Sequence, residues 1–145
     1  MHEASRVAKL LGGAKILKHR IETQRDLVTL VRTGIPVASL EALTRELDLS
    51  VDATADYLGL ARRTIARRKQ EDELLDPQQS ERVVRVANVL ALAKDVLGTI
   101  EKARTWLLKN NRGLGGAKPI SLLDTDVGAD EVRDVLMRVA YGVYG

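Results

Sequence analysis

A dense run of basic side chains is the strongest chemical signal in this sequence. Residues 62–69 hold five cations and no acid. Arg62, Arg63 and Arg67 fall on one face of a helix, and guanidinium groups hydrogen-bond guanine edges in a major groove. We therefore predict that these three arginines read double-stranded DNA, while Thr64 and Lys69 contact its phosphates.

The residues around this run predict how such a helix is held. Gly59 supplies a turn with positive φ, and Ala55 is small enough for two helices to approach closely. Leu58, Leu60 and Ile65 have the spacing that fills the space between those helices. This pattern predicts a helix-turn-helix. The alternative is a solvated surface helix, as short basic runs usually are, but such a helix needs no buried turn.

Length and composition favour an all-α protein. The chain has 145 residues, enough for one ordinary domain or two small helical ones, and its core must be aliphatic because phenylalanine is absent and aromatics make up 3%. The net charge of +3 is uneven: residues 1–72 hold 13 basic and 10 acidic groups, whereas residues 73–145 hold 10 of each. We expect the electrostatic attraction for nucleic acid to come from the N-terminal half.

Several kinds of chemistry are not expected. The chain has no cysteine, and His2 and His19 are not spaced as ligands, so we expect no disulfide, metal or cofactor. The turn at 113–118 lacks the spacing of a phosphate loop. No nucleophile with an activating base is apparent, so we expect no enzyme and no small-molecule substrate. Without an apolar run of membrane-spanning length, the expected location is the cytoplasm.

Helix signals divide the chain into three parts. Residues 1–23 are expected to form a loose helix or short strand, residues 24–72 the helix-turn-helix domain, and residues 73–145 a second domain. Ser50 is predicted to cap one helix, and the capping box of Asp76 and Gln79 opens a long helix from Pro77 to Leu97. Two apolar stripes predict that this helix is central or forms a dimer interface, and we expect a homodimer because operators are usually read by dimers.

Motifs in the second part resemble a known family. From Val83 onwards they match the toxin-binding domain of Xre/MbcA/ParS-like antitoxins, and residues 27–69 are similar to the Xre-like helix-turn-helix of that family. The motifs are Ala87-Asn-Val-Leu-Ala-Leu-Ala, Ala103-Arg-Thr-Trp-Leu, Asn111-Arg-Gly-Leu-Gly-Gly-Ala-Lys-Pro, Leu122-Leu-Asp-Thr and the ending Tyr141-Gly-Val-Tyr-Gly.

This resemblance implies a function and a second site. Family members are type II antitoxins that repress their own operon and cover the active site of a RES-domain toxin, an NAD-consuming enzyme. The implied toxin-binding residues are Asn111, Arg112, Leu114, Tyr141, Val143, Tyr144 and Gly145. Tyrosine is a favoured interface anchor, although both tyrosines could instead pack on their own domain. The alternatives are a stand-alone transcriptional regulator whose C-terminal domain only dimerises, and an interaction module that has lost DNA binding.

Overall fold

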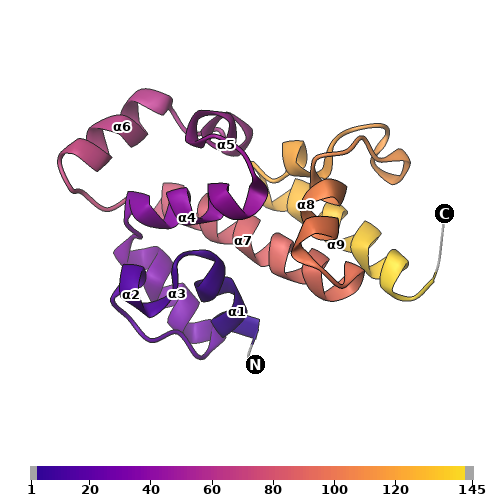
Figure 1. Cartoon of the computed structure of the whole chain (residues 1–145), viewed down its shortest axis with the longest axis horizontal. Coiled ribbons are helices and arrows are strands. Elements are labelled where there is room, and N and C mark those ends of the chain that lie inside the picture. Colours follow the sequence, from indigo (N-terminus) through magenta and orange to yellow (C-terminus); the bar gives the residue numbers. More distant parts are fainter. Residues whose placement is uncertain (1–2, 143–145) are drawn as a thin grey trace.

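The computed structural model describes residues 3–142, and throughout that range the chain is helical without strands (Figure 1). The all-α prediction is therefore confirmed. In chain order the elements are α1 (Glu3–Leu10), α2 (Gly13–Leu17), α3 (Gln24–Thr33), α4 (Val37–Leu47), α5 (Val51–Leu58), α6 (Arg62–Gln70), α7 (Pro77–Leu97), α8 (Ile100–Leu107), the 3-10 turns η1 (Arg112–Leu114) and η2 (Pro119–Leu122), and α9 (Asp126–Ala140).

Helix α7 is the axis around which the other helices pack. It contacts α1, α3 and α4 on one side, and α8 and α9 on another. None of its residues from Ser80 to Ala93 is fully exposed, so the two apolar stripes are both covered within one chain. The prediction of a central helix is thus confirmed. A homodimer stays a prediction, and it would need a surface other than the middle of α7.

Residues 3–23 are part of the core. Helices α1 and α2 are separated at Gly12, whose φ of 102° breaks the helical path without ending the packing. Val7, Leu11 and Leu17 are buried against the same core as the later helices. The short-strand alternative for this segment is therefore wrong. It arose because two helices of eight and five residues offer too few turns to show a clear period.

Local capping signals placed most other helix ends correctly. Ser50 accepts a hydrogen bond from the amide of Ala53, and Asp76 forms the predicted capping box with Gln79. Gly59 ends α5 with a φ of 69°. Pro36 is the N-cap of α4, so the helix begins at the next residue, Val37. These ends are local because a cap is formed by residues within one turn.

A backbone clasp joins the entry of α4 to the entry of α7. The amide of Leu75 donates to the carbonyl of Ile35 over 2.8 Å. Ser80 extends the clasp, since its hydroxyl accepts from the Ile35 amide over 3.0 Å and donates to the Leu75 carbonyl over 3.2 Å. At Gly34 an added Cβ would lie 2.3 Å from that carbonyl, so only glycine fits. Because the clasp joins the segment before α4 to the connection after α6, it holds α4, α5 and α6 together as one unit.

Candidate DNA and toxin interfaces

The turn between α5 and α6 has the expected helix-turn-helix construction. Ala55, Leu58, Leu60 and Ile65 are buried, as their spacing predicts. The amide of Leu60 donates to the carbonyl of Ala55 over 2.8 Å, which turns the chain sharply back toward α6. The carbonyls at the end of α5 receive a further donor from outside the motif, because Arg82 of α7 donates to Gly59 over 3.0 Å. The recognition helix is therefore oriented by the core and by α7.

Arg62 is held by carboxylates of α5. Its Nε donates to Asp56 Oδ1 over 3.0 Å, and Asp52 lies 3.7 Å from its Nη1. The hydrogen bond from Arg62 lowers the pKa of Asp56, and the same bond raises the pKa of Arg62. Two hydrogen bonds to one carboxylate fix the guanidinium plane. Arg62 is thus fixed against α5, and the carboxylates of Asp56 and Asp52 partly neutralise its charge.

The C-terminal end of α6 carries three more cations, and each has an acidic neighbour. Arg67 lies 3.6 Å from Glu71 and 3.8 Å from Glu73. Lys69 pairs with Glu41 of α4 over 2.7 Å. The Glu71 and Glu73 carboxyls share a hydrogen bond and repel each other, which raises the pKa of Glu71. Exposed pairs of this kind cost little to separate, so Arg67 and Lys69 remain available to phosphates.

Arg68 has a structural role and is mostly buried, unlike the other cations of α6. Its side chain is only 19% exposed, and its Nη1 donates to the carbonyl of Leu74 over 2.7 Å. It therefore ties the end of α6 to the connection that leads into α7.

Arg63 is the cation of α6 that has no ion-pair partner among residues 3–142, and it is exposed. It lies in the first turn of α6, where Ala61 provides no side-chain cap. The first amides of this helix consequently keep free donors, which favour a phosphate at the positive end of the helix dipole. Thr64 lies in the same turn and is partly exposed. Of the predicted DNA-binding residues, Arg63 is the freest to read a base.

The predicted toxin-binding residues after α8 divide into two kinds. Asn111 closes a compact loop: its side chain accepts from the Gly113 amide over 2.8 Å, and its own amide donates to Ala117 over 3.0 Å. Leu114 is buried in the core. Arg112 is exposed on this loop. In this structure Asn111 and Leu114 therefore shape the loop, and of the three residues Arg112 is the exposed one.

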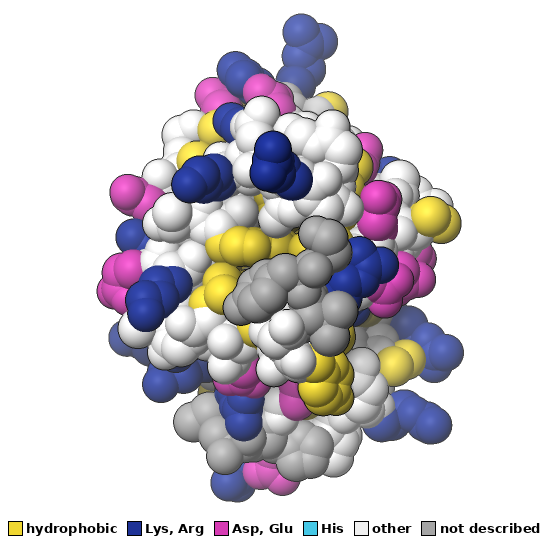
Figure 2. Space-filling model, turned by 90° about the vertical axis from the view of Figure 1, so that its right-hand side faces the viewer, with side chains coloured by type: hydrophobic (Ala, Val, Ile, Leu, Met, Phe, Trp, Pro, Cys, Tyr) yellow, Lys and Arg dark blue, Asp and Glu magenta, His cyan; other side chains and the backbone are white. Residues whose placement is uncertain are grey.

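The end of α9 exposes apolar surface. Tyr141 is 76% exposed and Met137, one turn earlier, is 37% exposed. Figure 2 shows the face at this end of the molecule, where hydrophobic side chains come to the surface among charged ones. Tyr141 therefore does not pack back on its own domain, which was the alternative for this residue. Val143, Tyr144 and Gly145 lie outside the described residues.

One arginine that the sequence analysis did not single out connects the middle of α7 to the start of α9. Arg85 of α7 is 7% exposed, and its Nη1 donates to the Leu123 carbonyl over 3.0 Å. Its Nε donates to Asp126 at the start of α9 over 3.1 Å, and it also pairs with Glu81. Burial raises the pKa of Glu81. No local pattern could identify Arg85, because its main partners lie about forty residues away in the chain.

Comparison with known proteins identifies both halves. Residues 26–88 match the family model for the antitoxin Xre-like helix-turn-helix domain, and residues 92–142 match the Xre/MbcA/ParS C-terminal toxin-binding domain. The chain is 32% identical over 119 residues to an antitoxin Xre of Yersinia enterocolitica, a match that covers 81% of this chain and 80% of that protein. The chain belongs to the Xre/MbcA/ParS antitoxin family.

Two further relatives show the range of the family. An antitoxin Xre of Pseudomonas putida is 35% identical over 83 residues, covering 57% of this chain and 52% of that protein. A Prs ADP-ribosylating antitoxin of a Sphingobium strain is 24% identical over 128 residues, covering 82% and 80%. This antitoxin therefore combines a helix-turn-helix DNA-binding domain with a toxin-binding domain. Within residues 3–142 no helix is long and apolar enough to cross a membrane.

Proposed function

We propose that this antitoxin neutralises an NAD-consuming RES-domain toxin by covering its active site with the C-terminal end of the chain. The observation that carries the proposal is the exposure of Tyr141 at the end of α9, next to the partly exposed Met137. An apolar ring that is left in solvent by its own domain gains free energy when it enters a cleft. The antitoxin itself supplies no catalytic group in this proposal.

The second part of the proposal is repression of the antitoxin's own operon. Helix α6 would lie in a major groove with Arg63 at a base edge. Arg62 and Arg67 would leave their carboxylate partners and contact the DNA instead. Binding as a homodimer would place two such helices on neighbouring half-sites. The membership in an antitoxin family with a helix-turn-helix domain supports this reading over a regulator without a toxin partner.

The test for neutralisation is NAD turnover by the purified partner toxin, titrated with the intact antitoxin and with a variant lacking residues 141–145. Because α9 ends at Ala140, we expect the deletion to leave helicity and DNA binding unchanged and to relieve inhibition. The Arg112→Ala variant is the comparison for a surface contact outside this end. If the deletion variant inhibits as tightly as the intact chain, occlusion must come from the loop that carries Arg112.

A further inference from the structure

The net positive charge of this protein does not come from the segment that contains α4, α5 and α6. Residues 37–72, which contain α4, α5 and α6, hold six basic and seven acidic side chains, a net charge of −1. Residues 1–36 hold seven basic and three acidic ones, a net charge of +4. The positive excess of the N-terminal half therefore belongs to the segment that contains α1, α2 and α3.

Most of these cations form one group, which we name the N-terminal basic surface: Lys15, Lys18, Arg20, Arg25 and Arg32. All five are exposed. Arg20 lies 2.6 Å from Glu22, whereas Lys15, Lys18, Arg25 and Arg32 have no ion-pair partner among residues 3–142. In this respect the four free cations resemble Arg63 and differ from the other cations of α6, which have acidic partners.

Few acids lie beside these cations, and although Arg32 shares a hollow with Glu3 and Glu81, it forms an ion pair with neither. In the stretch 13–33 the acidic residues are Glu22 and Asp26. The Asp26 carboxylate is occupied by the backbone, since it accepts from the amides of Glu22 over 2.9 Å and Thr23 over 3.0 Å. Those two hydrogen bonds lower the pKa of Asp26. The side chain completes the N-terminal cap of α3 and leaves Arg25 without a partner.

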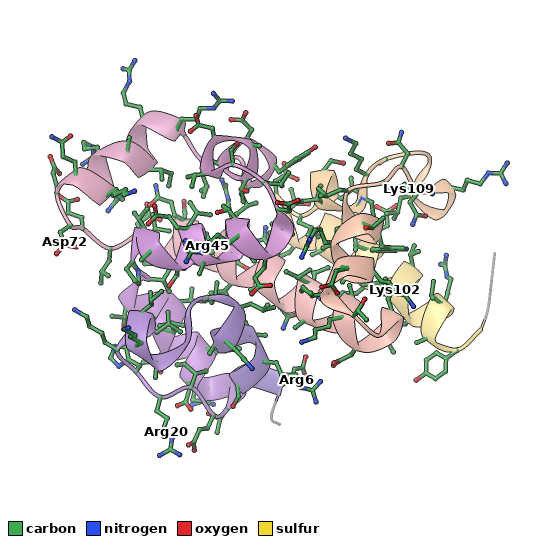
Figure 3. The ribbon with its side chains drawn as sticks, in the orientation of Figure 1. Arg6, Arg20, Arg45, Asp72, Lys102 and Lys109 are labelled. Atoms are coloured by element: carbon green, nitrogen blue, oxygen red, sulfur yellow. The ribbon has the colours of Figure 1, made fainter. Side chains whose placement is uncertain are left out.

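The fold places Arg20 beside α3, the helix that carries Arg25 and Arg32. Arg25 and Arg32 are seven residues apart on α3 and therefore share its outer face. The loop after α2 lies beside α3, because His19 and Arg20 line a small hollow of about 150 Å³ together with Thr29. Figure 3 shows Arg20 pointing away from the molecule on the side opposite α6. A duplex held by α6 does not reach this side of the same chain.

We propose that the N-terminal basic surface binds the phosphate backbone of a nucleic-acid duplex, separate from the segment that α6 reads. Charge complementarity favours this partner, because four free cations on an exposed surface match a regular row of phosphates. The stretch 13–33 has no Phe, Trp or Tyr to stack on bases or to anchor a protein partner. The contact is therefore with the backbone and does not depend on base sequence.

The test uses the full chain and a fluorescent duplex of random sequence. To silence the recognition helix, all proteins carry Arg62→Ala, Arg63→Ala and Arg67→Ala. In this background we compare the triple variant Lys18→Gln, Arg25→Gln, Arg32→Gln with a matched control that removes three exposed cations of the other half: Lys102→Gln, Lys109→Gln and Lys118→Gln. Lys102 and Lys109 lie at the far end of the molecule, on and just after α8 (Figure 3). Binding is followed by anisotropy as salt is varied.

We expect the N-terminal variant to lose about 0.9 in the slope of log affinity against log salt for each phosphate contact removed, and the control to keep the slope. If three contacts are removed, raising the salt from roughly 50 to 200 mM should weaken binding by the N-terminal variant about 40-fold less than binding by its parent. An unchanged slope in the N-terminal variant overturns the proposal. If the N-terminal variant keeps the slope but binds the toxin more weakly, the proposal is also overturned, and the surface is instead a contact for an acidic protein. Because α6 is silenced throughout, failure of operator recognition cannot be mistaken for either result.

Discussion

Replacing Arg85 with alanine removes the contacts that tie the middle of α7 to the start of α9. The Leu123 carbonyl would lose its buried donor, which costs about 1–3 kcal/mol. The pairs with Glu81 and Asp126 add less, about 0–1 kcal/mol each, because those carboxylates are 40% and 80% exposed. Together with the lost packing of the arginine stem, we expect the free energy of unfolding to fall by about 2–4 kcal/mol.

The assay is urea unfolding followed by circular dichroism and by the fluorescence of Trp106, which reports on α8. Arg133→Ala is the matched control, since Arg133 lines the same hollow as Arg85 but pairs with the exposed Asp130 and reaches the half-buried Asn88 only over 3.5 Å. We expect it to cost less than about 1 kcal/mol. If the two substitutions destabilise the protein equally, the buried contact with Leu123 has no special weight and the reasoning is refuted.

The same substitution has a pH signature. Burial already raises the pKa of Glu81, so the folded chain binds a proton there more readily than the unfolded chain. Removing the attraction of Arg85 raises this pKa further. A carboxyl with a raised folded pKa favours the fold when it is protonated, so the stability lost in Arg85→Ala is partly regained as the pH falls through that pKa. Unfolding curves of Arg85→Ala and of the double variant with Glu81→Gln, measured across the acidic range, check this, because the double variant should lack the recovery.

Three further changes test the clasp and the recognition helix. Gly34→Ala should destabilise the protein by about 2 kcal/mol or more, because it adds a close contact to the strain of a positive φ; Gly13→Ala, which has positive φ and open space, is the control in thermal melts. Ser80→Ala should cost about 1–3 kcal/mol by leaving the Ile35 amide unpaired, and a cost near zero by urea unfolding would show that the amide finds another partner. Arg63→Ala should weaken operator binding by about 1–3 kcal/mol and binding to random DNA only slightly; equal losses in a titration of both would make Arg63 a phosphate contact.

What the sequence could predict was the chemistry that acts within one helical turn. The caps at Ser50 and Asp76, the turn at Gly59 and the buried Ile65 follow from residues close in the chain, and the structure confirms them. The partners of the cations could not be predicted in this way. Whether Lys69 meets Glu41 depends on how α6 crosses α4, and that angle is set by the packing of the whole unit.

The charge distribution is a second property that the sequence could predict only in part. A count over the N-terminal half located the basic excess correctly, but such a count does not say which helices of that half carry it. Apart from Arg63, the arginines of α6 face carboxylates on α5, at the end of α6 or in the connection after it. Lys15 of α2 and Arg25 and Arg32 of α3 instead face solvent without an ion-pair partner among residues 3–142. Net charge is a sum over residues, but attraction for a polyanion depends on which charges remain uncompensated at one surface.

The continuity of α7 determines how the two halves of the antitoxin relate. The family models meet within this helix, since one ends at residue 88 and the other begins at residue 92, while the change in sequence character comes earlier, near residue 73. A helix buried on several sides has no place for a hinge at residues 88–92, and Arg85 fastens it to α9 just before that point. Arg82, also on α7, fastens it to the turn before α6. One rigid element therefore fixes the recognition helix relative to α9, so a toxin bound at the end of α9 would be held in a defined place relative to the DNA.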